Sequence, residues 1–320
     1  MDGSAGGLRA AVAGGVNIDV GGISHAPLVT GDSNPGTVHF SLGGVGRNIA
    51  HNLSLLGVQT SLLTALGDDP WAERIERSCR QLGIDITASL HVPGENTSVY
   101  LYLAGPEGDM AMAVSDMDIY ERLNPAALAG RLERLQGIQA LVLDTNLPAG
   151  TIAWLCEQAK VPVYADAVSA AKAGRLRAVL GKLRALKVNR LEAELLSGVP
   201  IRDGQSLEQA AETLLQTGLR QAFITLGAEG VLAAEGGTRL HLPAAQGEHV
   251  STTGCGDAFL AALVWAELQG MDLRDSARAG IAAAAITMAD EATVSPKISA
   301  EALHRILDKN KFGGQYEQVP

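Results

Sequence analysis

The chain is poor in cysteine and has no excess of positive charge. Its three cysteines, Cys79, Cys156 and Cys255, lie far apart, and no CxxC pair occurs. Such a set predicts neither a disulfide framework nor a zinc site, and it is typical of a protein in the reducing cytoplasm. The chain has 25 Lys and Arg against 35 Asp and Glu, which gives a net charge of -10. We therefore expect no nucleic-acid partner.

Long apolar runs and several catalytic signatures are also missing. The N-terminal segment has no apolar stretch of signal-peptide length, and no run of about 18 apolar residues indicates a membrane span. A GxxxxGK[ST] loop, a complete GxGxxG, HExxH and GxSxG are absent as well. These absences disfavour membrane attachment, a P-loop ATPase, a standard dinucleotide enzyme, a zinc protease and a serine hydrolase.

Short apolar runs alternate with helical patterns along most of the chain. Its 320 residues, 47% of them hydrophobic, can bury a large core in one large α/β domain or in two smaller ones. We expect strands at 8–16, 60–67, 140–146, 161–168, 184–189 and 221–227, and helices at 70–82, 149–159, 191–197 and 206–217. This alternation predicts a parallel sheet with helices on both faces.

Two segments interrupt the alternation. Val99, Leu101 and Leu103 alternate with Tyr100 and Tyr102 ahead of a PEGD turn, which predicts an antiparallel hairpin. Together with the segment GISHAPLVTGDSNPGTVHFS, this hairpin could form a small separate sheet. Since ligands of open α/β sheets bind at the carboxyl ends of the strands, such a sheet could cover a ligand and exclude water.

The segment STTGCGDAFLAALVWAE places one aspartate, Asp257, at the start of an apolar helix. Gly254 and Gly256 allow backbone N–H groups to converge ahead of the helix, where the helix dipole also attracts anions. The segment therefore predicts an anion site. The alternative is that Asp257 only complements the dipole in the first helical turn.

A second glycine cluster, GGVGRN at 43–48, allows a ligand to approach the backbone and offers the amide of Asn48. A tight turn with Asn48 as an N-cap is the alternative. Polar residues also follow several expected strands, namely Asn17 and Asp19, Asp144 and Asn146, and the segment VNRLEAE. Each could be a cap or loop residue, but all of them lie at the expected ligand edge of the sheet.

Four motifs occur in an order that resembles the ribokinase-like family, the B-type phosphofructokinase group of sugar and nucleoside kinases. They are GGVGRN, NRLEAE, TLGAEG and STTGCGDAF. The resemblance covers nearly the whole chain. It implies a three-layer α/β/α fold with a mostly parallel central sheet and a small β-sheet lid. It also implies one kinase domain over 1–310, with lid segments at about 20–42 and 91–115, followed by a C-terminal tail at 311–320.

The resemblance implies an ATP-dependent kinase and assigns roles to single residues. Asp257 is expected to be the catalytic base, and the N–H groups of Gly254, Cys255 and Gly256 are expected to form an anion hole. Residues on the nucleotide side are expected to be Asn189, Thr225 and Gly227, with Glu192 supporting Mg²⁺. Asp19 is expected to bind two ribose hydroxyls, surrounded by Asn17, Gly43, Gly44, Asn48 and Asn146.

Within the family, the lid segments DSNPG and VPGENTS resemble those of bacterial members that phosphorylate pseudouridine on its 5′-hydroxyl. Ser33, Asn34 and Thr97, together with Asn96, are candidates for reading the base, although their residue types also suit turns. A kinase for another nucleoside or for ribose is an alternative, as is a catalytically silent nucleoside-binding protein. We also expect a homodimer formed through the lid.

Two positions depart from the family pattern. Ser251 stands where many members have an aspartate near a monovalent-cation loop, so potassium activation is in doubt and we expect it to be weak. Cys255 replaces a more common alanine. We expect the Cys255 side chain to be an unreactive packing group. The alternative is that its position at a helix N-terminus lowers the pKa of the thiol.

Overall fold

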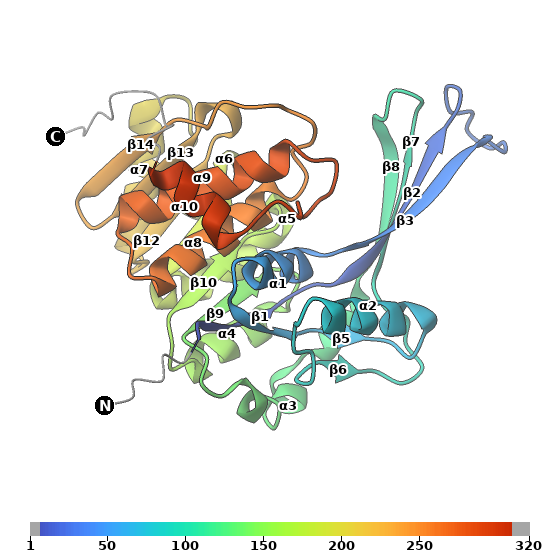
Figure 1. Cartoon of the computed structure of the whole chain (residues 1–320), viewed down its shortest axis with the longest axis horizontal. Helices are drawn as coiled ribbons and strands as arrows, with labels where there is room; N and C mark the ends of the chain where they lie inside the picture. The colour runs from blue at the N-terminus through green and yellow to red at the C-terminus, as the bar shows by residue number, and fades with distance from the viewer. Residues whose placement is uncertain (1–6, 309–320) are drawn as a thin grey trace.

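The computed structural model describes residues 7–308 and contains a large sheet between layers of helices, with a small sheet projecting from one side (Figure 1). The large sheet has eight strands in the order β14-β13-β12-β11-β10-β9-β1-β4. Only the pairings of β13 with its two neighbours are antiparallel. The strands are β1 (Arg9–Ala13), β4 (Gln59–Leu63), β9 (Ala140–Asp144), β10 (Val163–Asp166), β11 (Ala185–Asn189), β12 (Gln221–Thr225), β13 (Val231–Glu235) and β14 (Thr238–Leu242).

The central strands are apolar on both sides because helices cover both faces of the sheet. Val142 packs in one core cluster and Leu143 in the other, as alternation along β9 requires. The first layer consists of α1 (Val45–Leu55), α8 (Cys255–Leu268), α9 (Leu273–Met288) and α10 (Ala300–Asp308). The second consists of α4 (Ala149–Gln158), η3 (Gly174–Lys182), α6 (Arg190–Ser197) and α7 (Gly204–Gln216).

Shorter elements complete the main body. They are α2 (Pro70–Gln81), α3 (Pro125–Leu128), α5 (Ala170–Ala173), η1 (Asp118–Arg122), η2 (Leu132–Leu135), η4 (Gly227–Glu229) and the strand pair β5 (Ala65–Leu66) and β6 (Leu90–His91). Among residues 7–308, no helix combines the length and apolar character needed to cross a bilayer.

The small sheet, called the lid sheet below, has the strand order β3-β2-β7-β8. It contains β2 (Asn17–Ser24), β3 (Gly36–Gly43), β7 (Val99–Ala104) and β8 (Met110–Asp116). The antiparallel pairing of β7 with β8 confirms the predicted hairpin. In Figure 1 the lid sheet stands at the right of the main body, and β2 continues almost directly from β1. A strand of the large sheet therefore leads straight into the lid.

Several boundaries differ from the sequence-based expectation for local reasons. The expected strand 60–67 is two strands, because β4 ends at Leu63 and β5 pairs with a different partner, β6. The helix expected at 206–217 begins earlier, at Gly204, because the carboxylate of Asp203 accepts a hydrogen bond from the N–H of Ser206 and caps the helix. The expected tail at 311–320 lies outside the described residues.

Candidate active site

A row of charged side chains crosses the carboxyl ends of three strands. Asp144 of β9 is paired with Asp166 of β10, and Asp166 is paired with Lys187 of β11. Two residues earlier in each strand, Val142 and Tyr164 pack in the core cluster that contains α8. Since side chains two residues apart share a face, the charged row points toward the layer of α8. The fold therefore directs two carboxylates and one ammonium to the helix that carries Asp257.

The N-terminus of α8 is fixed by Gly254. This residue is the N-cap with a φ of 82°, and an added Cβ would lie 1.9 Å from the carbonyl oxygen of Thr293. Only glycine fits this turn without displacing the chain. Asp257 follows in the first turn, where its side chain is buried and the residue is 8% exposed. The first N–H groups of a helix have no partner within it, so this turn presents donors beside a buried carboxylate, although the N–H of Cys255 donates to the carbonyl oxygen of Thr252 at 3.3 Å.

The two glycine motifs meet at this carboxylate. The amide Nδ2 of Asn48 donates a 2.8 Å hydrogen bond to Oδ2 of Asp257, although the residues are 209 positions apart. The interpretation of Asn48 as an N-cap is wrong, because α1 begins at Val45 with Gly44 as its N-cap at a φ of 98°. The buried Oδ1 of Asn48 has no hydrogen-bond partner within residues 7–308. It is therefore available to accept a hydrogen bond from a ligand hydroxyl.

The surroundings of Asp257 favour its neutral form. Burial and, to a smaller extent, the charge of Asp166 raise the pKa of Asp257 to about 7, against the charge of Lys187 and the hydrogen bond from Asn48, which lower it. Asp144 is fully buried, and burial raises its pKa to about 6 against the hydrogen bonds from Gly15 and Asn146. A carboxyl with a pKa near neutrality suits a general base.

Lys187 is a site residue that the sequence interpretation missed. Its Nζ donates to Oδ2 of Asp166 at 2.9 Å, and an added Cβ on Gly256 would lie 2.6 Å from the same Nζ. The ammonium therefore lies against the glycine turn that begins α8. Burial alone would lower the pKa of Lys187, but the carboxylates of Asp166, Asp257 and Glu192 raise it, so the group is charged. The available signal was a lysine between the apolar residues Leu186 and Val188 of the expected strand at 184–189.

Two other polar residues project from the lid strand β2. Asn17 Nδ2 donates to Oδ1 of Asp19 at 2.5 Å, and an added Cβ on Gly43 would lie 2.1 Å from Oδ2 of Asp19. The carboxylate therefore lies across the Cα of Gly43, which explains glycine at that position. Burial raises the pKa of Asp19, while the hydrogen bond from Asn17 and the charge of Arg47 lower it.

Asn146 lies beside the end of β1. Its N–H donates to Oδ1 of Asp144 at 2.7 Å, and an added Cβ on Gly15 would lie 2.6 Å from its Nδ2. Lys172 of α5, which the sequence interpretation also missed, donates to Oδ1 of Asn146 at 2.6 Å. Asn146 is thus held at the strand ends, near the start of β2.

The residues expected on the nucleotide side meet at the ends of β11 and β12. Asn189 is paired with Thr225 in register, and Gly227 follows with a φ of 61° and open space around its Cα. Asn189 and Glu192 form a capping box at the start of α6, in which each side chain accepts a hydrogen bond from the other residue's backbone N–H. Within the described part of the chain, no three His, Cys, Asp or Glu side chains form a metal-binding group.

The side chains of the candidate base-reading residues Asn34 and Thr97 are already engaged in local hydrogen bonds. The amide of Asn34, next to Ser33, closes its own loop by bonding to the backbone of Val29 and Asp32. Thr97 is fully buried and bonds to Asp69 and Gly67. It supports the loop at the start of α2.

Cys255 is a packing residue. Its Sγ lies 3.4 Å from the carbonyl oxygen of Ala284. Burial, with a further contribution from Asp257, raises the pKa of the Cys255 thiol. The alternative of a lowered thiol pKa at the helix N-terminus is therefore wrong.

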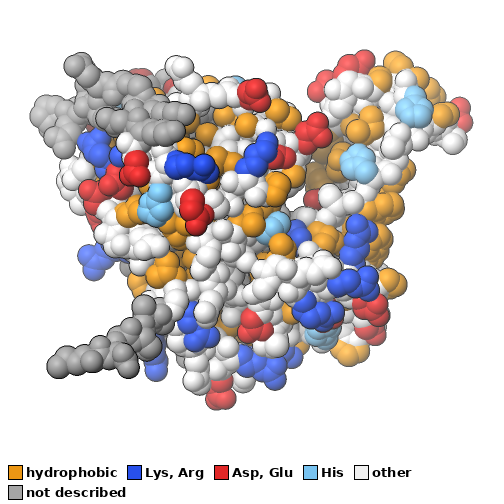
Figure 2. Space-filling model, in the orientation of Figure 1, with side chains coloured by type: hydrophobic (Ala, Val, Ile, Leu, Met, Phe, Trp, Pro, Cys, Tyr) orange, Lys and Arg blue, Asp and Glu red, His pale blue; other side chains and the backbone are white. Residues whose placement is uncertain are grey.

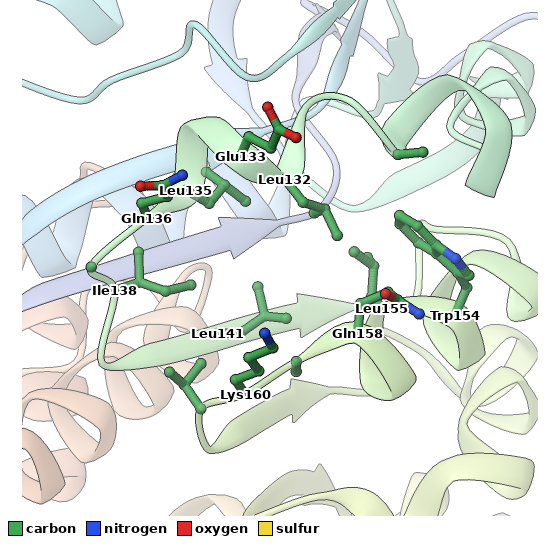
Figure 3. A pocket seen from close by; sticks show the side chains of 14 residues that line it. Leu132, Glu133, Leu135, Gln136, Ile138, Leu141, Trp154, Leu155, Gln158 and Lys160 are labelled. Atoms are coloured by element: carbon green, nitrogen blue, oxygen red, sulfur yellow. The ribbon is translucent and has the colours of Figure 1, made fainter.

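A separate hollow lies at the opposite end of the sheet (Figure 3). Its lining includes the apolar side chains of Leu132, Ile138, Leu141 and Trp154. Leu141 is near the start of β9, whereas Asp144 ends that strand. The hollow contains none of the residues that the motifs single out, so we do not assign it to the reaction.

Comparison with known proteins agrees with the motif order. Residues 8–300 match the pfkB family of carbohydrate kinases. The chain belongs to this family. The resemblance to the ribokinase-like, B-type phosphofructokinase group is therefore confirmed, and with it a role as a sugar or nucleoside kinase.

Individual members of the family are similar over most of their length. The chain is 36% identical to pseudouridine kinase of Escherichia coli over 90% of this chain and 93% of that protein. It is also 36% identical to an uncharacterized sugar kinase of E. coli, over 91% of this chain and 81% of that protein. Ribokinase from Thermotoga maritima superimposes with a TM-score of 0.84 at 23% identity, covering 94% of this chain and 99% of that one. This likeness confirms the α/β fold with a mostly parallel sheet and a separate small sheet.

Proposed function

We propose that the chain is an ATP-dependent kinase that phosphorylates the 5′-hydroxyl of pseudouridine to give pseudouridine 5′-phosphate. The observation that carries the proposal is the hydrogen bond between Asn48 and Asp257, which joins the two glycine motifs at a buried carboxylate with a pKa near 7. The similarity to E. coli pseudouridine kinase supports the choice of substrate. The equal similarity to an uncharacterized sugar kinase is the reason that the substrate has to be tested.

Asp257 is the proposed base. In its ionised form it takes the proton of the 5′-hydroxyl as the oxygen attacks the γ-phosphorus, and the bond from that phosphorus to the bridging oxygen of ADP breaks. The N–H groups of Gly254, Cys255 and Gly256 then face the charge on the transferring phosphoryl group. We add Lys187 to this set, because its ammonium lies against Gly256 and carries the charge that phosphoryl oxygens require.

The sugar is proposed to bind between the strand ends and the lid. Asp19, with a carboxylate oriented by Asn17, accepts hydrogen bonds from two ribose hydroxyls. Asn146 and the buried, unpartnered Oδ1 of Asn48 supply further polar contacts. Gly43 and Gly44 leave the space that a side chain would occupy. Lid closure over the sugar would exclude water, which otherwise competes as the phosphoryl acceptor.

ATP is proposed to lie along Asn189, Thr225 and Gly227, at the ends of β11 and β12. Mg²⁺ fits this region as an ion that keeps most of its waters, since the nearby oxygen donors are few. Glu192 would hold it through water, and the ion would neutralise charge on the phosphates. Potassium dependence should be weak, because the hydroxyl of Ser251 accepts a hydrogen bond from the N–H of Thr253 and brings no charge to its loop.

The proposal also covers the domain bounds, the location and the assembly of the chain. We take 1–310 as one kinase domain with the lid segments inserted, and a cytoplasmic location remains a prediction.

A homodimer through the lid sheet is proposed as well. In Figure 2 hydrophobic side chains run along the lid at the right of the molecule, where they stand clear of the main body. A second copy of the chain would cover them.

The test is a substrate panel with ATP and the full-length protein. ADP release should give the highest kcat/KM for pseudouridine, with uridine and ribose well below it, and mass spectrometry should identify a nucleoside 5′-phosphate. Asp257→Asn should lose about 10²–10⁴-fold in kcat while calorimetry gives nearly unchanged nucleoside binding.

Each alternative predicts a different result of this panel. Equal turnover of uridine and pseudouridine would overturn the substrate while leaving the kinase. Preferred turnover of ribose or another nucleoside would replace pseudouridine with that compound. Nucleoside binding without any ADP release would instead support a silent binding protein.

A further inference from the structure

We propose that a hydrogen-bonded pair on the lid sheet, His39 and Tyr102, recognises the nucleobase and determines specificity; this inference rests on the proposed nucleoside kinase function. The pair lies on the same face of the lid sheet as Asp19. Neither residue belongs to the motifs on which the family resemblance depends. Their placement follows from strand register, which brings β2, β3 and β7 side by side.

The register places the pair next to the proposed sugar site. Residues directly opposite each other on neighbouring strands share a face, as do residues two apart on one strand. Asp19 is opposite Ser41 of β3 and Tyr100 of β7. Two residues farther along β2, Gly21 is opposite His39 and Tyr102. We call the side of the lid sheet that carries Asp19, Gly21, Ser41, His39, Tyr100 and Tyr102 the inner face.

Gly21 has no side chain because the pair occupies the space above it. An added Cβ on Gly21 would lie 2.3 Å from Nε2 of His39 and 2.5 Å from the hydroxyl oxygen of Tyr102. The two side chains therefore lean toward each other across β2. Their Nε2 and hydroxyl oxygen are 2.8 Å apart, and their ring centroids are separated by 6.0 Å at an interplanar angle of 67°.

The spacing from Asp19 suits a nucleoside. Gly21 is two residues from Asp19, about 7 Å along a strand, and a base attached to a ribose held by Asp19 extends over a comparable length. The DSNPG loop is much farther away. Asn34 precedes Gly36, which pairs with Ser24, five residues or about 17 Å along β2 from Asp19. With its amide bonded within its own loop, Asn34 is less suited than the pair to contact the base.

The pair can also supply the hydrogen-bond acceptor that pseudouridine requires. Pseudouridine has an N1–H that uridine lacks, because its glycosidic bond is formed through carbon. If Nε2 of His39 donates to the Tyr102 hydroxyl, Nδ1 is an acceptor, and it has no hydrogen-bond partner in the described part of the chain. His39 is exposed in this structure, so this acceptor loses its water only when the lid closes over a nucleoside. Uridine would then leave the acceptor unsatisfied, which can produce strong discrimination between pseudouridine and uridine.

The experiment measures kcat/KM for pseudouridine, uridine and ribose in the full-length protein and its variants. His39→Ala should lower kcat/KM for pseudouridine at least about tenfold, so that the ratio of kcat/KM for pseudouridine to that for uridine falls to near one. Because ribose has no base, its kcat/KM should change less than about twofold. Tyr102→Phe removes only the hydroxyl that fixes the imidazole. It should raise KM for pseudouridine more than it lowers kcat.

His25→Ala is the matched control, because His25 is another exposed lid histidine bonded to a hydroxyl, that of Thr37, beyond the end of β2. This variant should leave kcat/KM for all three substrates unchanged. A wild-type preference for pseudouridine that persists in both His39→Ala and Tyr102→Phe overturns the inference and leaves the proposed function standing. A preference that is lost in Asn34→Ala but retained in His39→Ala also overturns the inference and leaves the proposed function standing. A wild-type enzyme that phosphorylates ribose but no nucleoside overturns the proposed function and this inference together.

Discussion

At the scale of single residues, the site places three buried carboxyl groups near the ammonium groups of Lys187 and Lys172. The charges of Asp144 and Asp166, at the ends of β9 and β10, act on Asp257 of α8, and Lys187 bonds to Asp166. Burial and mutual repulsion raise the pKa values of Asp144 and Asp257. Such groups favour folding in their neutral forms, so the arrangement costs stability at neutral pH and is better explained by chemistry than by packing.

Lys187→Met should therefore change the pH dependence of the reaction. Asp257 is the proposed base and acts when ionised, so kcat/KM should rise with pH through its pKa, near 7. Lys187 favours the ionised form and lowers that pKa, so its removal should move the acidic limb upward by about one pH unit, along with a loss of kcat. Lys182→Met, at an exposed pair with Glu157, is the control and should not move the limb. A limb that stays in place in Lys187→Met would show that this ammonium does not tune the base.

At the scale of elements, the sequence predicted those parts of the site that are formed within a single segment of the chain. The start of α8 was predictable, since Gly254 and Asp257 act within a single turn. The polar residues after the strands were predicted to converge because parallel strands end at one edge. Lys187, in contrast, depends on the register between β10 and β11, and His39 with Tyr102 depends on a three-strand register. A lysine within an apolar strand could have drawn attention to Lys187, but no local pattern specifies the register that places these residues beside their partners, which explains why they were missed.

Gly254→Ala tests whether the turn before α8 positions the reacting groups. The new Cβ would collide with the carbonyl of Thr293, and the positive φ is unfavourable for alanine, so the first N–H groups should move. Loss of one such donor elsewhere costs about 10²–10³-fold in kcat, and we expect a loss of that order. Gly270→Ala at the other end of α8 has a similar φ of 78° with open space around it and should cost only stability. Equal kcat in the two variants would contradict the role of the turn.

At the scale of the whole molecule, the lid sheet has two faces of different character. The inner face carries Asp19 and the His39–Tyr102 pair. The opposite, outer face is apolar, because Phe40, Val20, Leu101 and Val114 lie opposite one another across the four strands. Phe40 stacks on Trp71 of α2, but Val38 and Val114 remain 61% and 63% exposed. An apolar sheet face of this extent is unfavourable in water, so a partner that covers it is expected.

A second copy of the chain would meet this requirement, since a twofold interface brings the same apolar face from both subunits together. Val114→Lys should place a charge in that interface and convert a dimer into a monomer in sedimentation velocity at a fixed micromolar concentration. KM for the nucleoside should rise in the variant, because a lid sheet packed on one side only closes less firmly over the sugar. Leu191→Lys makes the same change at an exposed apolar position on α6 and should leave the dimer intact. A wild-type protein that sediments as a monomer at the same concentration would contradict the assembly, and the outer face would then require a different partner.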